Sequence, residues 1–153
     1  MKYIIATTKD EFEAAKKLFT DYATWLNIDL CFQNFSKELD EIEKMYAANN
    51  GGIYLCIDDN NYIACSAIRR IDENTCELKR MWVQQNYQGK GIGEELLKKC
   101  IELAKNLNYI TIRLDTLSRL QPAIQLYKKY GFEETGSYYN NPNPDVVYMK
   151  KEL

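Results

Sequence analysis

Four stretches of the chain place apolar residues at helical spacing, and several carry a start or stop signal. In the first, Thr8 is followed three residues later by Glu11, the capping-box pattern of a helix start. In the last, Pro122 lies near the start and Gly131 just past the end, the usual order around a helix. We therefore predict about four helices: from Thr8 to Leu26, from Ser36 to the turn at residues 49–52, from the glycine-rich stretch 88–93 to Asn108, and from Pro122 to Gly131.

Shorter runs of apolar and β-branched residues alternate with these stretches and predict about seven strands. The Asp-Asn-Asn turn at residues 59–61 favours a hairpin between the second and third strands. The order of the elements predicts an α/β chain in which one mixed, mostly antiparallel sheet is packed by helices, and we interpret residues 1–153 as one domain. The predicted strands are Tyr3–Ala6, Ile53–Asp58, Tyr62–Ile71, Thr75–Val83, Tyr109–Asp115, Phe132–Ser137 and Val146–Lys150.

The stretch Gln88–Gly93, Gln-Gly-Lys-Gly-Ile-Gly, joins the strand that ends at Val83 to the third predicted helix. Its glycines leave backbone N–H groups unobstructed at the helix N-terminus, where the helix dipole adds partial positive charge. The stretch therefore suits a phosphate or pyrophosphate, although a simple connector is the alternative interpretation. A P-loop would need Lys and then Ser or Thr after its last glycine, and a Rossmann fingerprint would need its third glycine one residue later, so both mismatches argue against ATP and NAD.

Length and charge exclude several classes of function. The 153 residues are enough for one domain with a full core. The 20 basic and 22 acidic residues give a net charge of −2, whereas a nucleic-acid-binding face would be basic. No apolar run approaches membrane-spanning length, and the N-terminus lacks the apolar body of a signal peptide. We therefore expect a cytoplasmic protein with no nucleic-acid or membrane partner.

The five cysteines are scattered without a Cys-x-x-Cys pair, and the chain contains no histidine. In apolar stretches a reduced cysteine acts as a small hydrophobe, and we favour this interpretation over a disulfide framework. Without histidine the usual zinc ligand sets and Ser-His-Asp catalysis are unavailable, so we expect no metal. A general base must then be a carboxylate, a lysine, a tyrosine or a water.

A second motif, Leu-Tyr-Lys-Lys-Tyr-Gly-Phe at residues 126–132, follows the glycine-rich stretch with the predicted elements between them. Together with the strand order and the Gln-x-x-Gly-x-Gly pattern, it makes the chain resemble the GNAT superfamily of acyl-CoA-dependent N-acyltransferases, in a bacterial branch. The resemblance is densest from Cys76 to Phe132. It implies a three-layer fold with a central sheet, and acetyl-CoA as the acyl donor.

The resemblance also implies how the donor is held. In such enzymes the loop amides bind the pyrophosphate, and the end of the preceding strand pairs with the pantetheine arm. The splay between that strand and the next forms the acyl slot, with the Val83 amide as an oxyanion donor. Many relatives carry an asparagine where this chain has Leu120, so we expect Ser118 or Gln121 to replace that contact, or the contact to be missing. The residues assigned to cofactor binding are Met81, Trp82, Val83, Gln88, Gly89, Lys90, Gly91, Ile92 and Gly93.

Two residues are candidates for proton transfer. Glu77 stands where several family members place a glutamate that deprotonates the amine, directly or through water; the alternative is an exposed strand carboxylate paired with Lys79 or a neighbour. Tyr127 matches the family's tyrosine that donates a proton to the departing CoA thiolate. The alternative for Tyr127 is a core aromatic whose hydroxyl is satisfied.

The acceptor side is predicted at the first two helices, their linker and the loop Tyr138–Pro144. A cationic-amine site is one interpretation of its residues; aromatic core positions and solvated acids are the other, which helical spacing favours. The predicted function is acetyl transfer from acetyl-CoA to a primary amine of a small-molecule or peptide acceptor, by direct transfer in a ternary complex. The rivals are a non-catalytic acyl-CoA-binding module and a nucleotide-binding regulatory domain, and a homodimer is compatible with the family. The residues of the acceptor side are the aromatics Tyr22, Trp25, Phe32, Phe35 and Tyr139 and the acids Asp21, Asp29, Glu38, Asp40, Glu41 and Glu43.

Overall fold

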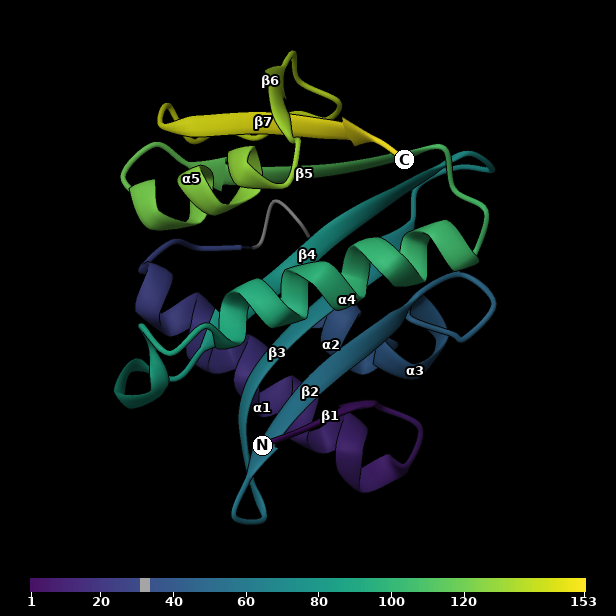
Figure 1. Cartoon of the computed structure of the whole chain (residues 1–153), viewed down its shortest axis with the longest axis vertical. Coiled ribbons are helices and arrows are strands. Elements are labelled where there is room, and N and C mark those ends of the chain that lie inside the picture. The colour runs from purple at the N-terminus through teal and green to yellow at the C-terminus, as the bar shows by residue number, and fades with distance from the viewer. Residues whose placement is uncertain (31–33) are drawn as a thin grey trace.

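A seven-stranded sheet forms the middle layer of the molecule, with the strand order β1-β2-β3-β4-β5-β7-β6 (Figure 1). The computed structural model describes residues 1–30 and 34–153. Every neighbouring pair of strands is antiparallel except β4 and β5, which run parallel, so the predicted mixed, mostly antiparallel sheet is confirmed. The strands are β1 (Lys2–Ile5), β2 (Gly52–Asp58), β3 (Asn61–Arg70), β4 (Thr75–Val83), β5 (Thr111–Leu117), β6 (Glu133–Thr135) and β7 (Val146–Glu152).

Helices cover both faces of the sheet, which gives the three layers seen in Figure 1. One face carries α4 (Ile92–Asn106) and α5 (Gln121–Lys129), which share a buried cluster with β4 and β5. The other face carries α1 (Lys9–Leu26), α2 (Phe35–Asp40) and α3 (Ile42–Met45). A second buried cluster joins α1 and α3 to β2 and β3. The sheet therefore has an apolar core on each side.

The capping box predicted for α1 is confirmed. The Thr8 side chain accepts a hydrogen bond from the Glu11 N–H, and the Glu11 carboxylate accepts one from the Thr8 N–H. Apolar side chains at helical spacing, among them Phe12, Ala15 and Phe19, are buried against the sheet. This pattern fixes which side of α1 faces the core.

The second predicted helix is divided into α2 and α3. The division falls at Glu41, whose φ of −112° and ψ of 25° leave the helical region. The prediction that Ser36 starts the helix is wrong, because the residue before the first turn is Asn34, in the left-handed conformation with φ 55°. The apolar spacing carries on across the break, which is why the sequence pattern reads as one helix.

All seven predicted strands are present, but only β4 matches its predicted bounds at both ends, and the ends that differ do so by one or two residues. β5 begins at Thr111 and continues to Leu117, beyond the predicted end at Asp115, because it pairs with β7 along its whole length. β6 is shorter than the predicted run 132–137 and spans only Glu133–Thr135. The extension of β5 places Asp115 inside a paired strand.

The cysteines that the structure describes behave as predicted. Cys56, Cys65, Cys76 and Cys100 are free thiols with fully buried side chains. The fifth, Cys31, lies outside the described residues. Within residues 1–30 and 34–153, no helix combines the length and the apolar character needed to cross a membrane.

Candidate active site

β4 and β5 separate after a short parallel contact, and this separation creates the site. They pair only over Thr75–Glu77 and Thr111–Arg113. Beyond those residues β4 continues to Val83 and β5 to Leu117 without pairing to each other. The carboxyl ends of neighbouring parallel strands are a common place for ligands, and here the family-implied acyl slot has the space it needs.

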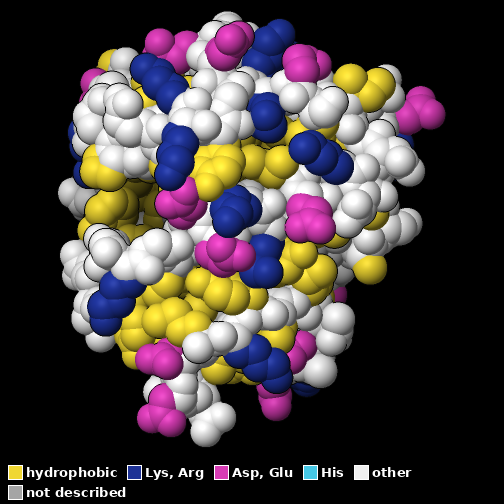
Figure 2. Space-filling model, in the orientation of Figure 1, with side chains coloured by type: hydrophobic (Ala, Val, Ile, Leu, Met, Phe, Trp, Pro, Cys, Tyr) yellow, Lys and Arg dark blue, Asp and Glu magenta, His cyan; other side chains and the backbone are white. Residues whose placement is uncertain are grey.

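A groove of about 700 Å³ lies beside the ends of these strands, a volume typical of small-molecule sites. Figure 2 shows it as a hollow with hydrophobic side chains, between α5 and the loop before α4 as labelled in Figure 1. Of the residues predicted to bind the cofactor, all but Lys90 line this groove. The Lys90 ammonium instead lies 5.2 Å from the centre of the Tyr87 ring. The predicted residues that line the groove are Met81, Trp82, Val83, Gln88, Gly89, Gly91, Ile92 and Gly93.

The glycine-rich loop has the geometry of an anion site. Gly89 and Gly91 have φ values of 79° and 81°, which glycine adopts readily and other residues rarely do. Gly91 caps α4 without a side chain, so the first N–H groups of the helix have no intrahelical acceptor. Glu94, in the first turn, lines the groove, and its carboxylate accepts hydrogen bonds from Lys129 and Tyr130 at 2.7 and 2.6 Å, so the Lys129 charge offsets its own. These features fit a pyrophosphate.

Tyr127 lies where the groove meets a smaller cavity. It is 7% exposed, lines both spaces, and packs its ring against Phe132 at 5.7 Å. Burial raises the pKa of its hydroxyl, so the phenol stays protonated and remains a donor at neutral pH. Among the described residues, no hydrogen-bond partner is assigned to this hydroxyl. Tyr127 is therefore a buried aromatic with a protonated hydroxyl at the junction of the two spaces.

The smaller cavity has a volume of about 50 Å³ and lies between β4 and β5. Tyr22, Met81, Thr116 and Tyr127 line both this cavity and the groove. Its wall also carries charged and amide side chains that were not among the predicted site residues, although Asn141 and Asn143 belong to the loop predicted at the acceptor side. These side chains are Lys79, Arg80, Asp115, Asn141 and Asn143.

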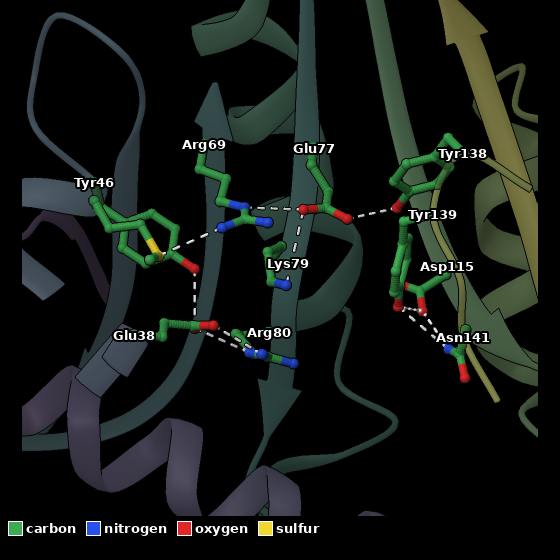
Figure 3. Close-up of polar contacts among 11 residues, drawn as sticks. Glu38, Tyr46, Arg69, Glu77, Lys79, Arg80, Asp115, Tyr138, Tyr139 and Asn141 are labelled. Atoms are coloured by element: carbon green, nitrogen blue, oxygen red, sulfur yellow. Dashed lines mark hydrogen bonds and ion pairs between the residues drawn. The ribbon is translucent and has the colours of Figure 1, made fainter. Parts of the chain in front are cut away.

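Glu77 is buried beside the smaller cavity but lines neither it nor the groove. Its carboxylate accepts from Arg69 Nε at 3.0 Å and from the Tyr138 hydroxyl at 2.5 Å, and Lys79 Nζ lies 3.8 Å away (Figure 3). Burial raises the pKa of this carboxyl, but the charges of Lys79 and Arg69 and the Tyr138 hydrogen bond outweigh burial and hold it below its usual range. Glu77 is therefore ionised at neutral pH, and its pairing with Lys79 is present as the alternative interpretation expected, although its side chain is not exposed.

The two cations that follow Glu77 on β4 are also buried. Arg80 has φ 58°, and the β3–β4 register shifts beside it, which marks a bulge. Its guanidinium binds both oxygens of Glu38 on α2 (Figure 3). Burial and the charge of Arg80 lower the pKa of Lys79 to about 8, so Lys79 is mostly protonated at neutral pH.

The predicted acceptor side is divided between the two spaces. Tyr22 and Trp25 line the groove, with Trp25 lying 5.1 Å from Trp82 between ring centres. Phe35 lies under the Arg80 guanidinium at 5.2 Å, and the Tyr139 hydroxyl donates to Asp115. These aromatic side chains therefore lie around the site and do not form a single cluster. Phe32 lies outside the described residues.

The predicted acids do not form a common binding site. Glu38 is 1% exposed and paired with Arg80, so its interpretation as a solvated acid is wrong. Asp29, Asp40 and Glu43 are exposed, as expected for solvated acids. None of the six predicted acids lines the groove or the smaller cavity; the others are Asp21 and Glu41.

Neither residue predicted to replace a cofactor contact at Leu120 lines the groove. Leu120 and Arg119 line the groove, whereas Ser118 and Gln121 do not. The Gln121 side chain donates to the Ser118 carbonyl at 2.5 Å, which holds these two residues to each other. Arg119 is the polar residue nearest in sequence to Leu120 that faces the groove.

The family model for acetyltransferases of the GNAT family matches residues 12–132. This range includes both motifs and every residue predicted for cofactor binding or proton transfer. The chain belongs to this family. An uncharacterized N-acetyltransferase of Schizosaccharomyces pombe is 36% identical over 140 residues, which cover 90% of this chain and 86% of that protein. The GNAT chain is thus an N-acetyltransferase by family, as its sequence predicts.

Solved structures support the fold. An acetyltransferase of the GNAT family from Staphylococcus aureus is 25% identical, with a TM-score of 0.81 and 99% of each chain covered. A GNAT family acetyltransferase from Elizabethkingia anophelis, 31% identical, has a TM-score of 0.61 over 74% of this chain and 82% of that chain. That structure contains bound acetyl-CoA. In the described part of the present chain, no group of three or more Cys, Asp or Glu side chains is placed to hold a metal ion.

Proposed function

We propose that this chain transfers the acetyl group of acetyl-CoA to a primary amine of a small-molecule or peptide acceptor, by direct transfer while both are bound. The observation that carries the proposal is the junction of the two spaces at Tyr127. A donor in the groove and an acceptor in the smaller cavity would meet at the residues that line both, Tyr22, Met81, Thr116 and Tyr127. Direct transfer needs this proximity, because it converts a bimolecular step into one within a complex.

The glycine-rich loop and the end of β4 are the proposed donor site. The free N–H groups from Gly89 to Gly93 would bind the pyrophosphate, and Met81–Val83 would pair with the pantetheine arm. The Val83 N–H is the proposed donor to the thioester oxygen. The Gln88 side chain donates to the Val83 carbonyl at 2.9 Å, which ties the loop to the strand and supports this placement.

Two proton transfers complete the proposed mechanism. The amine must lose a proton before it attacks the thioester carbonyl, and Glu77, or a water that it orients, is the proposed base. Glu77 is ionised, as a base must be, and its place outside the cavity favours the route through water. Tyr127 is the proposed donor to the CoA thiolate, since it is protonated and faces both spaces.

The family membership favours an enzyme over the two rivals, the non-catalytic acyl-CoA-binding module and the nucleotide-binding domain. The test is release of CoA thiol when the protein is mixed with acetyl-CoA and a panel of amines. Turnover with an amine supports the proposal, and binding of acetyl-CoA without turnover on any amine would favour the binding module. The homodimer and the cytoplasmic location stay predictions.

A further inference from the structure

Opposite charges face each other across the smaller cavity. On the β4 side, Glu38 is paired with Arg80, and Glu77 is paired with Arg69 and, at 3.8 Å, with Lys79. Lys79 adds a third cation to this network, which gives the five side chains a net charge of +1. Lys79 is 7% exposed and lines the cavity. This wall of the cavity is therefore positive.

The opposite wall is negative. Asp115 on β5 lines the cavity, and both hydrogen bonds assigned to its side chain among the described residues end on Oδ2. They come from the Tyr139 hydroxyl and from Asn141 Nδ2, the latter at 2.9 Å. Figure 3 shows Lys79 on β4 and Asp115 on β5 on either side of the space between the two strands. The bonds orient the carboxylate and leave Oδ1 for another donor.

The size of the cavity limits what it can hold. A volume of about 50 Å³ would accommodate roughly three to five water molecules, which is close to the size of one ammonium and one carboxylate on a shared carbon. Thr116, next to Asp115, lines both the cavity and the groove, and so does Tyr127. The negative wall therefore continues into the proposed donor site, as the β4 wall also does at Met81.

We propose that the smaller cavity binds the head group of an amino-acid-like acceptor, with Lys79 taking its carboxylate and Asp115 its amino group. The proposal rests on the proposed function and names the substrate class of its acceptor. Arg80 is less suited to the carboxylate, because Nε and Nη2 already donate to both oxygens of Glu38. The amino group at Asp115 would lie toward Thr116 and Tyr127, where the acetyl group is proposed to arrive.

The experiment compares acceptors that differ only in the carboxylate. The twenty free L-amino acids, their α-amides and the corresponding decarboxylated amines are assayed by release of CoA thiol from acetyl-CoA. We expect at least one free amino acid to have a kcat/KM at least about tenfold above its amide and its amine, since charge-assisted hydrogen bonds are lost in both. Preference for the amides or amines, or no turnover with any free amino acid, would overturn the inference.

Variants of Lys79 assign the effect to the proposed residue. In Lys79→Met we expect the ratio of kcat/KM for the free amino acid to kcat/KM for its amide to fall to about one. Lys79→Arg should retain part of this preference. Lys105→Met removes an exposed lysine in the last turn of α4 and should keep the full preference. A preference that survives in folded Lys79→Met would contradict the assignment, and the comparison of acids with amides in the wild type stands even if that variant does not fold.

The failures of the two proposals are distinguishable. A protein that binds acetyl-CoA in thermal unfolding but acetylates only amines without a carboxylate retains the proposed function and loses the amino-acid site. A protein whose unfolding temperature does not respond to acetyl-CoA loses the proposed function itself.

Discussion

Arg80 Nε and Nη2 donate to the two carboxylate oxygens of Glu38 at 3.0 and 2.8 Å, and this pair joins the bulge in β4 to α2. Both side chains are at most 6% exposed. The Tyr46 hydroxyl donates to the same carboxylate at 3.0 Å. The bulge that places Lys79 and Arg80 next to the cavity is thus held by a buried charge pair in which both carboxylate oxygens accept hydrogen bonds.

Removing one member of this pair should strongly destabilise the fold. In Glu38→Gln the Arg80 guanidinium stays buried without its counter-charge, and we expect the free energy of unfolding to fall by about 3 kcal/mol or more. Urea unfolding measures the difference. Glu95→Gln, which removes the exposed pairs with Lys98 and Lys99, is the control and should cost about 1 kcal/mol or less. Equal losses in the two variants would contradict the role given to Glu38.

Lys79 should give stability a pH dependence of defined sign. Burial and the Arg80 charge lower its folded pKa to about 8, whereas an unfolded lysine has a pKa of about 10.4. Between these values the unfolded chain holds a proton that the folded protein has released, so stability rises with pH. The charges that act most on the pKa of Lys79 are those of Glu77 and Arg80 on β4, Arg69 on β3 and Glu38 on α2, and Asp115 on β5 lies across the cavity.

We therefore compare the free energy of unfolding of the wild type with that of Lys79→Met. The wild-type value minus the variant value should increase by on the order of 2–3 kcal/mol between about pH 7.5 and pH 10. The difference between the two proteins removes the contributions of the other groups to the pH dependence, because those groups titrate in both. Urea unfolding at several pH values measures the gain. A difference that stays flat across this range would mean that Lys79 has an ordinary pKa in the folded protein.

Tyr127→Phe tests the proposed proton donor. Loss of the hydroxyl should lower kcat by about 100-fold or more, while binding of acetyl-CoA changes little, because the ring still packs on Phe132. Steady-state kinetics with titration of acetyl-CoA separates the two effects. The matched control is Tyr130→Phe, because Tyr130 donates to Glu94 but does not itself line the groove, and this variant should leave kcat nearly unchanged. A kcat within about twofold of wild type for Tyr127→Phe would remove this role.

Glu77→Gln tests the proposed base through the pH profile. Without a base the reaction depends on the fraction of amine that is already neutral, which falls tenfold per pH unit below its pKa. The variant should therefore lose most of its kcat/KM at low pH and recover as pH rises. The lowered pKa of Glu77 keeps the wild-type carboxylate ionised throughout that range. A uniform loss at every pH would indicate that Glu77 only positions Arg69, Lys79 and Tyr138.

The donor half of the site was predictable from sequence because its geometry is local. A glycine that adopts positive φ, a helix start and the strand before it lie within a few consecutive residues, so spacing alone places Gly89, Gly91 and Val83 together. The sheet was predictable for the same reason, since each strand carries its own apolar pattern. The break at Glu41 was not, because the apolar spacing continues through it.

The acceptor half depends on contacts between distant segments. Asp115 meets Asn141 and Tyr139 from the loop before β7, and Arg80 meets Glu38 from a helix some forty residues earlier. No local pattern pairs such residues. One signal was available: Lys79 and Arg80 are consecutive cations inside an apolar strand. Because successive side chains of a strand point to opposite faces of the sheet, the two cations cannot both lie on one solvent-facing side.

Thermal unfolding with acetyl-CoA, CoA, ATP and NAD in parallel tests the central claim, that the groove at the glycine-rich loop holds acetyl-CoA. A ligand at about 100 times its Kd stabilises by roughly 2.7 kcal/mol, which is several degrees for a chain of this size. Gly91→Ala places a side chain at φ 81° and should weaken the response, whereas Gly136→Ala, in open space without a positive φ, should not. The account predicts a rise with acetyl-CoA and CoA but not with ATP or NAD. No rise with either acetyl-CoA or CoA would contradict it.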